Sequence, residues 1–443
     1  MSALARLLGD ELRTAAAAPL ADWSGQVLRY DGLIVECAGF PAAPGSRCRV
    51  ETLDGAGVTG EIVGFADGRN MLFLDRPGAR IVAGARVTLL DDGSQAAVGP
   101  GLLGRVLDAD GAPLDGGAAP DTPDTWPLAG REMNPLIRTP VDTALDVGVR
   151  AINAALTVGR GQRVGIIAGS GVGKSVLIEM MTKSTTADVI VVGLIGERAR
   201  EVGAFVSKVM TGEAAARVCI VAVPADRSPL LRLRGAQRAT AIAEYFRAEG
   251  KQVLLIMDSL TRVAHAKREV GLALGEQPTA KGYPPSVVSM IPQLLERAGP
   301  GLPGEGAITA FYTILADGDD TNDPVVDGAR AILDGHLVLS RKQAQMGMYP
   351  AIDIPQSVSR VMNDVVDPEH RAAARKLRAM VADYMENRDL MLMGGYSEGQ
   401  DAALDTAIAH WPAITRLLRQ NEEEKADFDA SRAQLLAVTA DVA

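Results

Sequence analysis

The sequence predicts an α/β core that follows a small β-barrel and precedes a helical domain. Three observations carry this prediction. From Gly25 to about Gln95, short runs rich in Val, Ile and Leu alternate with Asp-Gly pairs, which is typical of hairpins in a small closed barrel. From Val164 to about Ser340, apolar runs alternate with helical patterns, which indicates a largely parallel sheet with helices on both faces. Beyond Pro368, long polar-apolar segments predict helices.

The first 20 residues form the first predicted element. Leu4, Leu7, Leu8 and Leu12 fall on one face at helical spacing, with charges opposite, and an alanine run follows. One interpretation is an amphipathic helix packed on its own domain. The other, which we favour slightly, is a helix that docks on another protein, because the turn-rich segment after it offers no helical neighbour.

The predicted barrel contains about six short strands, separated by Asp31-Gly32, Asp54-Gly55, Asp67-Gly68 and Asp92-Gly93. Residues 96 to 140 are rich in proline and predicted to be loops. The terminal helices are expected to break at Gly394-Gly395 and Gly399. The predicted core strands are Val164–Ala168, Val189–Ile195, Val218–Val223, Val253–Met257, Ile308–Leu315 and His336–Leu339.

The composition limits the classes of function. With 47% hydrophobic residues among 443, the chain can bury large cores and is not disordered. The net charge of −10 and the pI near 5.1 argue against nucleic acid as the main partner, because a nucleic-acid binder must neutralise phosphates. The three cysteines form no CxxC pair and the four histidines do not cluster. We therefore expect neither a disulfide framework nor a histidine-based metal site, and we predict a protein of the reducing cytosol.

No segment is predicted to cross a membrane. The longest apolar stretch, Val189–Ile195, is far shorter than the ~20 residues that a bilayer requires. Charges at Arg6, Asp10 and Glu11 interrupt the apolar residues of the N-terminus, so we do not predict a signal peptide there.

A phosphate-binding loop follows the first core strand. Val164–Ala168 runs directly into Gly169-Ser170-Gly171-Val172-Gly173-Lys174-Ser175, and a helical pattern follows. This is a P-loop in its strand–loop–helix context, in which backbone N–H groups and the helix N-terminus cradle phosphates. Lys174 is expected to reach the β- and γ-phosphates and Ser175 to bind Mg²⁺. The usual first glycine is replaced by Ala168, which requires a negative φ at that position.

Two further strands end in carboxylates. Asp258 follows Val253–Met257, which fits the acid that organises Mg²⁺ in P-loop NTPases, through a water molecule. Glu197 follows Val189–Ile195 and could polarise the attacking water. The alternative for Glu197 is a structural ion pair with Arg198, and the spacing does not distinguish the two.

Together these residues resemble one family, the rotary-type hexameric ATPases with a RecA-like core. The branch with the strongest resemblance is the flagellum-specific ATPases of type III protein export, in which Ala168 is expected. The resemblance covers nearly the whole chain and rests on AGSGVGKS, GLIGERAREV, DRSPLLRLRGAQRAT, MDSLTRVAHAKREVG, KGYPPSV, LSRKQAQMGMYPAID and SVSR.

The resemblance implies roles for individual residues. Glu197 matches the glutamate that activates the hydrolytic water, and Arg198 and Arg262 match arginines near the γ-phosphate. Tyr349 matches the aromatic ring on which adenine packs. Arg360 in SVSR matches an arginine finger that crosses to the neighbouring subunit's nucleotide. The implied ligands are ATP and Mg²⁺.

The predicted activity is therefore a Mg-dependent ATP hydrolase that forms a homohexamer and assists export of flagellar proteins. Four segments are expected: a docking helix at 1–24, a barrel at 25–95, a P-loop nucleotide-binding ATPase domain at 96–367 and a helical domain at 368–443. The alternative is the virulence-type (injectisome) secretion ATPase, which uses the same chemistry. Glu197 argues against a non-catalytic assembly subunit, and the acidic pI argues against an RNA translocase.

The resemblance also implies partners and a location. A stator-like regulatory protein is expected at the N-terminal helix, and a central-stalk-like protein at the turn Met391–Gly399. The acidic loop Asp317–Asp323 is expected to face the central pore of the ring; it lacks the Gly and Glu of an EF-hand. Export gate, chaperones and flagellar substrates are the other implied partners. The expected location is the cytoplasmic face of the inner membrane at the flagellar base, with peripheral membrane association only.

Overall fold

A computed structural model describes residues 23–315 and 323–442. The chain divides into two compact units, with the boundary between Ser94 and Gln95. The predicted N-terminal helix and most of the acidic loop Asp317–Asp323 lie outside the described residues. Among the described residues, no helix is long and apolar enough to span a membrane.

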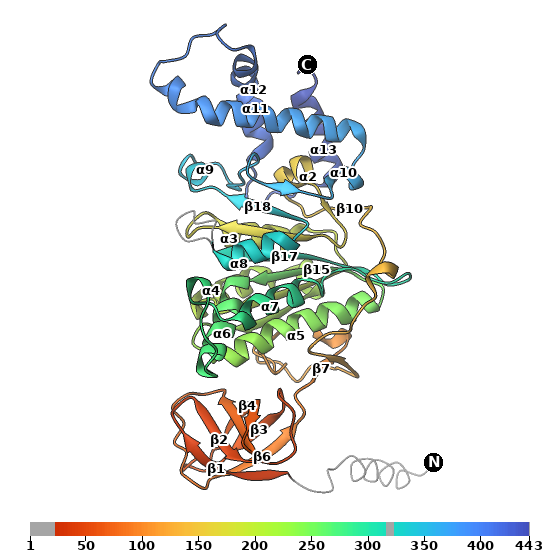
Figure 1. Ribbon diagram of the computed structural model, residues 1–443. Helices are drawn as coiled ribbons and strands as arrows, with labels where there is room; N and C mark the ends of the chain where they lie inside the picture. Colours follow the sequence, from red (N-terminus) through yellow and green to blue (C-terminus); the bar gives the residue numbers. More distant parts are fainter. Residues whose placement is uncertain (1–22, 316–322, 443) are drawn as a thin grey trace, which may run out of the picture. The chain divides into compact units, whose positions relative to one another are not determined.

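The first unit is a closed β-barrel with the strand order β1-β2-β5-β4-β3-β6, as the sequence predicted (Figure 1). Asp67 and Gly68 both have positive φ, 51° and 70°, and form the two-residue turn between β4 and β5. Asp92-Gly93 was expected to form a hairpin too, but that prediction is wrong, because β7 pairs with β9 and not with β6. The barrel strands are β1 Ser24–Tyr30, β2 Ile34–Ala38, β3 Arg47–Val50, β4 Val58–Ala66, β5 Arg69–Leu74 and β6 Arg86–Asp91.

The barrel interior is apolar and includes two of the cysteines. Cys37 and Cys48 are fully buried among Val, Ile, Leu and Phe side chains. All three cysteines of the chain are free and buried. Burial raises the pKa of the Cys37 thiol to about 11, so this cysteine packs as a small apolar side chain and not as a nucleophile.

A 9-stranded sheet with the order β19-β18-β12-β17-β15-β13-β14-β8 forms the centre of the second unit, and β16 pairs beside β17. The pairs from β18 to β8 are parallel, β19 adds an antiparallel edge beside β18, and β16 pairs antiparallel with the start of β17. The sheet strands are β8 Arg105–Leu107, β12 Arg163–Ala168, β13 Val189–Ile195, β14 Val218–Val223, β15 Gln252–Asp258, β16 Gly299–Pro300, β17 Ala307–Leu315, β18 Gly335–Leu339 and β19 Val358–Ser359.

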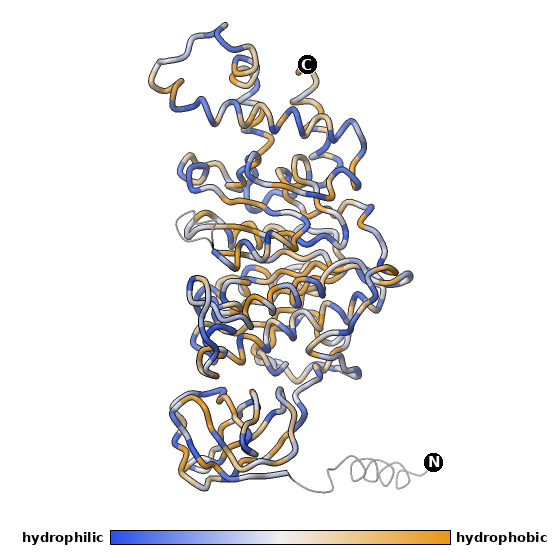
Figure 2. Tube along the Cα trace, in the orientation of Figure 1, coloured by the Kyte–Doolittle hydropathy of each residue, from blue (hydrophilic) through white to orange (hydrophobic). Residues whose placement is uncertain are grey.

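Both faces of this sheet are buried, and for that reason its strands read as continuous apolar runs in the sequence. Along β13, Ile190, Val192 and Leu194 join one core, while Val189 and Val191 join the other. The strands are accordingly apolar along much of their length in Figure 2. The first core is completed by α2 Arg150–Ala155, α3 Lys174–Ser184, α4 Ala199–Val209 and the C-terminal helices. The second is completed by α5 Pro229–Ala248, α6 Leu260–Ala273, α7 Pro285–Leu295 and α8 Pro324–Ile332.

The proline-rich stretch 96–140 is more regular than its composition indicated. β8 pairs with β14 at the edge of the central sheet, and β9 Asp124–Pro127 pairs with β7 Gln95–Val98. Buried partners hold this stretch in place: the Trp126 indole N–H donates to Glu244 at 2.9 Å, and Arg297 pairs with the same carboxylate at 2.8 Å. The remaining short elements are β10 Ala144–Leu145, β11 Val158–Gly159, α9 Arg341–Gln345, α10 Met362–Val365, and the 3-10 turns Pro100–Leu102, Pro135–Ile137, Glu213–Arg217 and Ala280–Gly282.

Three helices end the chain: α11 Pro368–Leu392, α12 Ala402–Leu418 and α13 Phe428–Thr439. The predicted break at Gly394-Gly395 and Gly399 is confirmed, since α11 ends just before these glycines. Asp367, Asp401 and Asp427 cap the three N-termini through their side chains. The fold class predicted from the sequence is therefore confirmed, while the division of the second unit at residue 367 stays a prediction.

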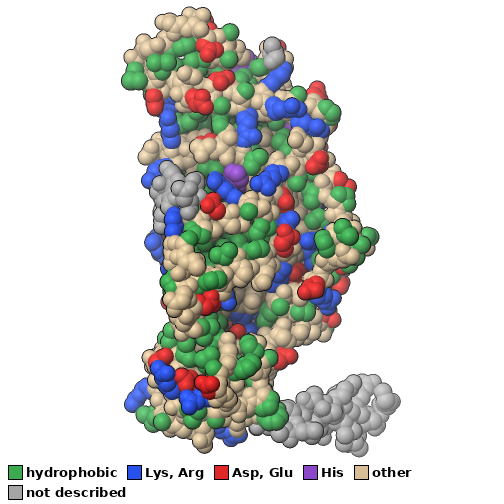
Figure 3. Space-filling view, in the orientation of Figure 1, with side chains coloured by type: hydrophobic (Ala, Val, Ile, Leu, Met, Phe, Trp, Pro, Cys, Tyr) green, Lys and Arg blue, Asp and Glu red, His purple; other side chains and the backbone are tan. Residues whose placement is uncertain are grey.

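On the face shown in Figure 3, acidic and basic side chains are interspersed.

Candidate functional site

The P-loop joins the buried strand β12 to the helix α3. Gly171 and Gly173 have φ of 77° and 90°, a conformation that side chains other than glycine rarely adopt. Gly173 is the N-cap of α3, so the N-terminus of the helix opens directly from the loop. Ala168 is still part of β12 and pairs with Leu315 and Leu339. Its backbone is therefore extended, and alanine meets no strain at the first position of this loop.

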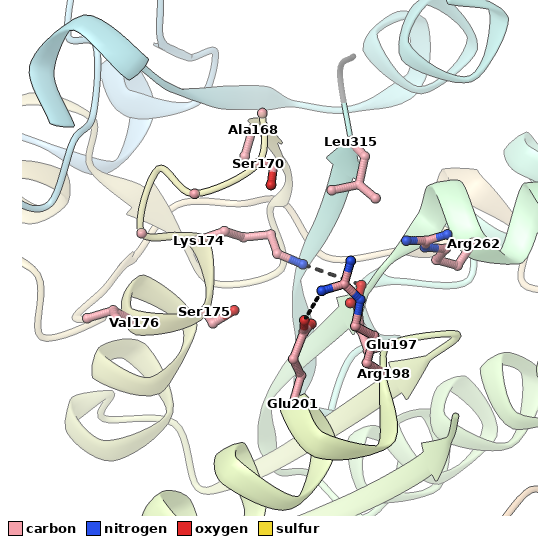
Figure 4. Close-up of a pocket in the computed structure, with 13 residues that line it drawn as sticks. Ala168, Ser170, Lys174, Ser175, Val176, Glu197, Arg198, Glu201, Arg262 and Leu315 are labelled. Atoms are coloured by element: carbon pink, nitrogen blue, oxygen red, sulfur yellow. Dashed lines mark hydrogen bonds and ion pairs between the residues drawn. The ribbon is translucent and has the colours of Figure 1, made fainter. Parts of the chain in front are cut away.

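A cavity of about 360 Å³, here called the P-loop cavity, lies over this loop (Figure 4). Charged side chains from three other elements reach it: Glu197, Arg198, Glu201 and Arg262. The remaining lining residues are Ala168, Gly169, Ser170, Gly171, Gly173, Lys174, Ser175, Val176 and Leu315. Val172 of the loop is buried in the core beneath. The helix N-terminus and Lys174 make this an anion-binding cavity bordered by carboxylates.

Lys174 bridges the two carboxylates that the sequence singled out. Its ammonium group pairs with Asp258 and lies 3.5 Å from Glu197 Oε1. All three side chains are largely buried, with 13%, 12% and 7% exposed for Lys174, Glu197 and Asp258. The structure thus brings together residues that are 84 positions apart. A phosphate group that enters here can pair with the Lys174 ammonium group.

The Asp258 carboxylate is held from the neighbouring strand. Thr313 on β17 donates its hydroxyl to Asp258 Oδ1 at 2.7 Å. This contact leaves the carboxylate anchored at the C-terminal end of β15, where ligands bind in open α/β sheets. The sequence analysis missed Thr313, because a threonine inside an apolar strand gives no signal of its partner.

Glu197 lies on the turn between β13 and α4. Gly196 precedes it with a φ of 75°, and a Cβ there would stand 2.7 Å from Cβ of Arg262. The glycine therefore lets Glu197 and Arg262 approach each other. Burial raises the pKa of the Glu197 carboxyl, and Asp258 adds to the rise, whereas Lys174 and Arg262 oppose it. A buried carboxylate with a raised pKa beside a phosphate site is suited to accept a proton from water.

The two arginines differ in their settings. Arg198 is the N-cap residue of α4, its side chain is 80% exposed, and it lies 3.4 Å from Glu201. Arg262 on α6 is half-buried and lines the same cavity. The alternative of a Glu197–Arg198 ion pair is not what the structure contains, because Arg198 pairs with Glu201 instead. Glu201 gave no signal in the sequence beyond its place in the first turn of α4.

A smaller cavity of about 120 Å³ opens beside the P-loop cavity. Its polar lining consists of the Ser175 hydroxyl and the carboxylates of Glu179, Glu197, Glu201 and Asp258. Hydroxyl and carboxylate oxygens are the ligands that Mg²⁺ prefers. Among the described residues, no group of three or more His, Cys, Asp or Glu is arranged to hold a metal by itself. The residues therefore fit Mg²⁺ bound jointly with phosphate oxygens, and not a site made by protein alone.

Tyr349 borders a third cavity of about 440 Å³, here called the Tyr349 cavity. It shares Gly171, Gly173 and Val176 with the P-loop cavity, and its far side consists of residues 420–422. The Tyr349 side chain is exposed, which leaves its ring open to a ligand. The Gln420 backbone N–H donates to the Tyr349 carbonyl at 2.9 Å. Sequence analysis missed residues 420–422, because only the fold brings the C-terminal helices to the P-loop.

Arg360 lies apart from these cavities and lines none of the three. It follows β19, is exposed, and donates from its guanidinium to the Arg330 carbonyl at 3.3 Å. The arginine therefore does not complete the P-loop cavity of its own chain.

Comparisons with known proteins found two matching family models and relatives that align with most of this chain. Residues 148–359 match the ATP synthase alpha/beta family, nucleotide-binding domain, and residues 366–437 match the T3SS EscN ATPase C-terminal domain. The chain is 52% identical over 417 residues to the flagellum-specific ATP synthase of Salmonella typhimurium, covering 92% of this chain and 91% of that one. It is 43% identical over 408 residues to the type 3 secretion system ATPase of Sinorhizobium fredii, covering 91% and 90%.

A solved structure shares the fold. It is the assembled ATPase EscN in complex with its central stalk EscO, from the type III secretion system of enteropathogenic E. coli. The TM-score is 0.86 at 38% sequence identity, and the match covers 94% of this chain and 99% of that one.

Proposed function

Because the chain belongs to the family of flagellum-specific and type III secretion ATPases, we propose that it hydrolyses ATP to drive or assist export of flagellar proteins. The observation that carries the activity is the contact of Lys174 with both Glu197 and Asp258 at the end of a P-loop, where the P-loop cavity and the smaller cavity lie side by side. The relative with 52% identity is a flagellum-specific enzyme, whereas the type 3 secretion system ATPase is 43% identical. The flagellar assignment is therefore preferred to the injectisome alternative.

In this proposal the P-loop holds the phosphates of ATP. Its backbone N–H groups, from Gly169 to Gly173, and the N-terminus of α3 face the negative charge. Lys174 leaves its carboxylate partners and binds the β- and γ-phosphates. Ser175 and Asp258 would hold Mg²⁺, and the ion would neutralise phosphate charge when bound. Release of Lys174 toward the nucleotide frees Asp258 for this task.

Glu197 is the residue proposed to activate the attacking water. Its raised pKa makes the carboxylate a stronger base than a solvent-exposed glutamate. Once Lys174 turns to the phosphates, one of the two cations that stabilise the Glu197 charge has left. Arg262, which also lowers this pKa, remains beside the water and the γ-phosphate. Arg198, which follows Glu197 on the same turn before α4, lines the same cavity.

A neighbouring subunit supplies the last cation. Arg360 is exposed and outside its own cavity, which supports a role as an arginine finger in the next subunit's site. One chain carries both the P-loop and the finger, so six copies with one repeated heterologous interface would close a ring with six equivalent sites. Tyr349 is proposed to pack on the adenine ring.

The partners follow from the family. A structure of EscN contains a central stalk, and we propose that the turn Met391–Gly399 meets a similar stalk, since Leu392 and Met393 expose apolar side chains there. A stator-like regulator at residues 1–20, the export gate, chaperones and export substrates complete the proposed machine. Its proposed location is the cytoplasmic face of the inner membrane at the flagellar base.

The test is Mg-ATP hydrolysis by the full chain carrying Lys174→Ala. Loss of the phosphate-binding cation should remove at least nine tenths of the activity, because the transferred phosphoryl group depends on it. The matched control is Lys251→Ala, which changes an exposed lysine outside the three cavities. Activity of Lys174→Ala above a tenth of wild type would refute the assignment.

A further inference from the structure

Gln162 forms a buried hydrogen-bonded junction just before the P-loop strand. Its side chain is fully buried, on the turn between β11 and β12. The side-chain oxygen accepts the Gly159 backbone N–H at 2.9 Å. The side-chain amide donates to the Asp334 carbonyl at 2.9 Å and to the Ser359 hydroxyl at 3.1 Å. Both amide protons and the amide oxygen are therefore in use.

Two of these partners, Ser359 and Asp334, hold the backbone at Arg360 in place. Ser359 directly precedes Arg360, and its hydroxyl donates to the Thr157 carbonyl at 2.7 Å. The Arg360 backbone N–H donates to the Asp334 carbonyl at 2.9 Å. The Asp334 carbonyl thus receives both the Gln162 amide and the Arg360 N–H. Gln162 and the backbone of Arg360 are linked through a single oxygen atom.

The chain that enters β19 is held by the buried Ser357, whose hydroxyl accepts the Val338 N–H at 2.9 Å and whose carbonyl accepts from Arg378. β19 consists of Val358–Ser359 alone, and it pairs only with Gly335 and His336 of β18. Gly335 leaves the room that the junction needs, because a Cβ there would stand 2.4 Å from the Val358 carbonyl oxygen and 3.1 Å from Gln162 Nε2. The Arg360 side chain beyond the junction is exposed. The hydrogen bonds of Ser359 and Asp334 hold the base of this side chain, and the bond from its guanidinium to the Arg330 carbonyl at 3.3 Å holds its tip.

We propose that Gln162 is a positioning residue for Arg360, and that it ties the P-loop strand of one subunit to the finger that this subunit gives its neighbour. The inference rests on the proposed action of Arg360 in trans. Gln162 is covalently continuous with β12, which runs into the P-loop, and its carbonyl accepts the Ala310 N–H of β17 at 2.9 Å. A shift of β12 when nucleotide binds would move the junction and the base of the finger together.

Gln162→Ala removes the hydrogen bonds of the Gln162 side chain to Gly159, Asp334 and Ser359. Since a misplacement of about 1 Å can cost ~100-fold in rate, we expect kcat to fall 10- to 100-fold, with the KM for ATP nearly unchanged. Ser359→Ala should act in the same direction but less, because the Asp334 contacts remain. Ser359→Thr keeps the hydroxyl and should retain most of the activity. A purely structural role would lower thermal stability without this selective fall of kcat at an unchanged KM.

The decisive experiment mixes variants of the full chain in pairs and measures ATP hydrolysis. Lys174→Ala inactivates the P-loop but retains Arg360. Arg360→Ala lacks the arginine finger but retains an intact P-loop. Gln162→Ala should regain activity when mixed with Lys174→Ala, because some interfaces then combine an intact P-loop with an intact finger. It should regain none when mixed with Arg360→Ala, because every finger is then defective.

The opposite pattern, or unchanged activity of Gln162→Ala alone, would overturn the inference. Lack of recovery in the control mixture of Lys174→Ala with Arg360→Ala would instead refute action in trans, and with it the proposed function of Arg360. Nucleotide binding of Gln162→Ala should match wild type, whereas its melting temperature should fall, because buried partners such as the Gly159 N–H lose their acceptor. If that variant does not fold, Ser359→Ala takes its place in the same mixtures, and its failure to behave like Arg360→Ala counts against the proposal.

Discussion

The ring of Tyr349 lies against Gly173, and a Cβ on that glycine would stand 3.4 Å from the ring's Cδ1 and Cε1 atoms. The last glycine of the P-loop thus separates the phosphate-binding turn from the aromatic ring. This contact connects the P-loop cavity with the Tyr349 cavity. A nucleotide could therefore place its phosphates in one cavity and its base in the other.

Gly173→Ala should abolish nucleotide binding. The φ of 90° at Gly173 strains any side chain, and relief of the strain would rotate the amides that face the phosphates. Binding of a fluorescent ATP analogue measures the effect. Gly203→Ala is the matched control, because Gly203 lies on α4 and a Cβ there meets nothing within 4 Å. Normal binding by Gly173→Ala would show that the loop does not need its left-handed turn.

Tyr349→Ala should raise the KM for ATP by about 3- to 10-fold and change kcat less. An aromatic stacking contact is typically worth 0.5–1.5 kcal/mol, and it forms with the base in both the ground state and the transition state. Tyr349→Phe keeps the ring and should resemble wild type. Steady-state kinetics with ATP and with GTP measure this effect. An equal KM for Tyr349→Ala and wild type would show that the base does not bind in the Tyr349 cavity.

The rate of hydrolysis should fall as the pH is lowered through a pKa above the ordinary carboxyl value of 4.5. Burial raises the pKa of Glu197, and the protonated acid cannot accept a proton from water. The raised pKa of Glu197 affects stability in the opposite sense to the lowered pKa of a salt-bridged acid. Ionisation costs stability at neutral pH, and the cost disappears below the unfolded pKa. Glu197→Gln should therefore melt at a higher temperature than wild type at neutral pH, with the gain lost at acid pH.

Deletion of residues 1–20 should leave ATP hydrolysis largely intact and remove a stator-like partner. The face of Leu4, Leu7, Leu8 and Leu12 is apolar, and the barrel closes its own core from β1 to β6. An apolar stripe without a place in the chain's own core is typical of a partner site. Co-purification with full-length and shortened chains measures it. Equal recovery of the partner would favour a helix packed on its own domain.

Much of the fold could be predicted because the strands carry strong patterns. β13 was predicted from Val189 to Ile195, its observed bounds, since a strand buried on both faces is apolar at every position. β8 was missed, because Arg105–Leu107 is too short to form a pattern and lies among prolines and glycines. Its place at the sheet edge depends on pairing with β14, which is more than a hundred residues away.

The site was predictable where its residues end a strand or form a fixed motif, as Lys174 and Asp258 do. Thr313 and Gln162 could not be recognised, because their roles consist of hydrogen bonds to residues 55 to 197 positions away. The role of Arg360 entered only by resemblance. That role stays a prediction; the Arg360 side chain is exposed and lies outside the P-loop cavity of its own chain.

The most direct test of the account is Glu197→Gln, measured for nucleotide binding and for phosphate release on the same preparation of the full chain. The amide nearly preserves the shape of the side chain but is a much weaker base for the attacking water. We expect ATP to bind with an affinity close to that of wild type, and phosphate release to fall by at least ~100-fold. Loss of binding together with turnover would make Glu197 a structural residue, and retained turnover would contradict its role as the base.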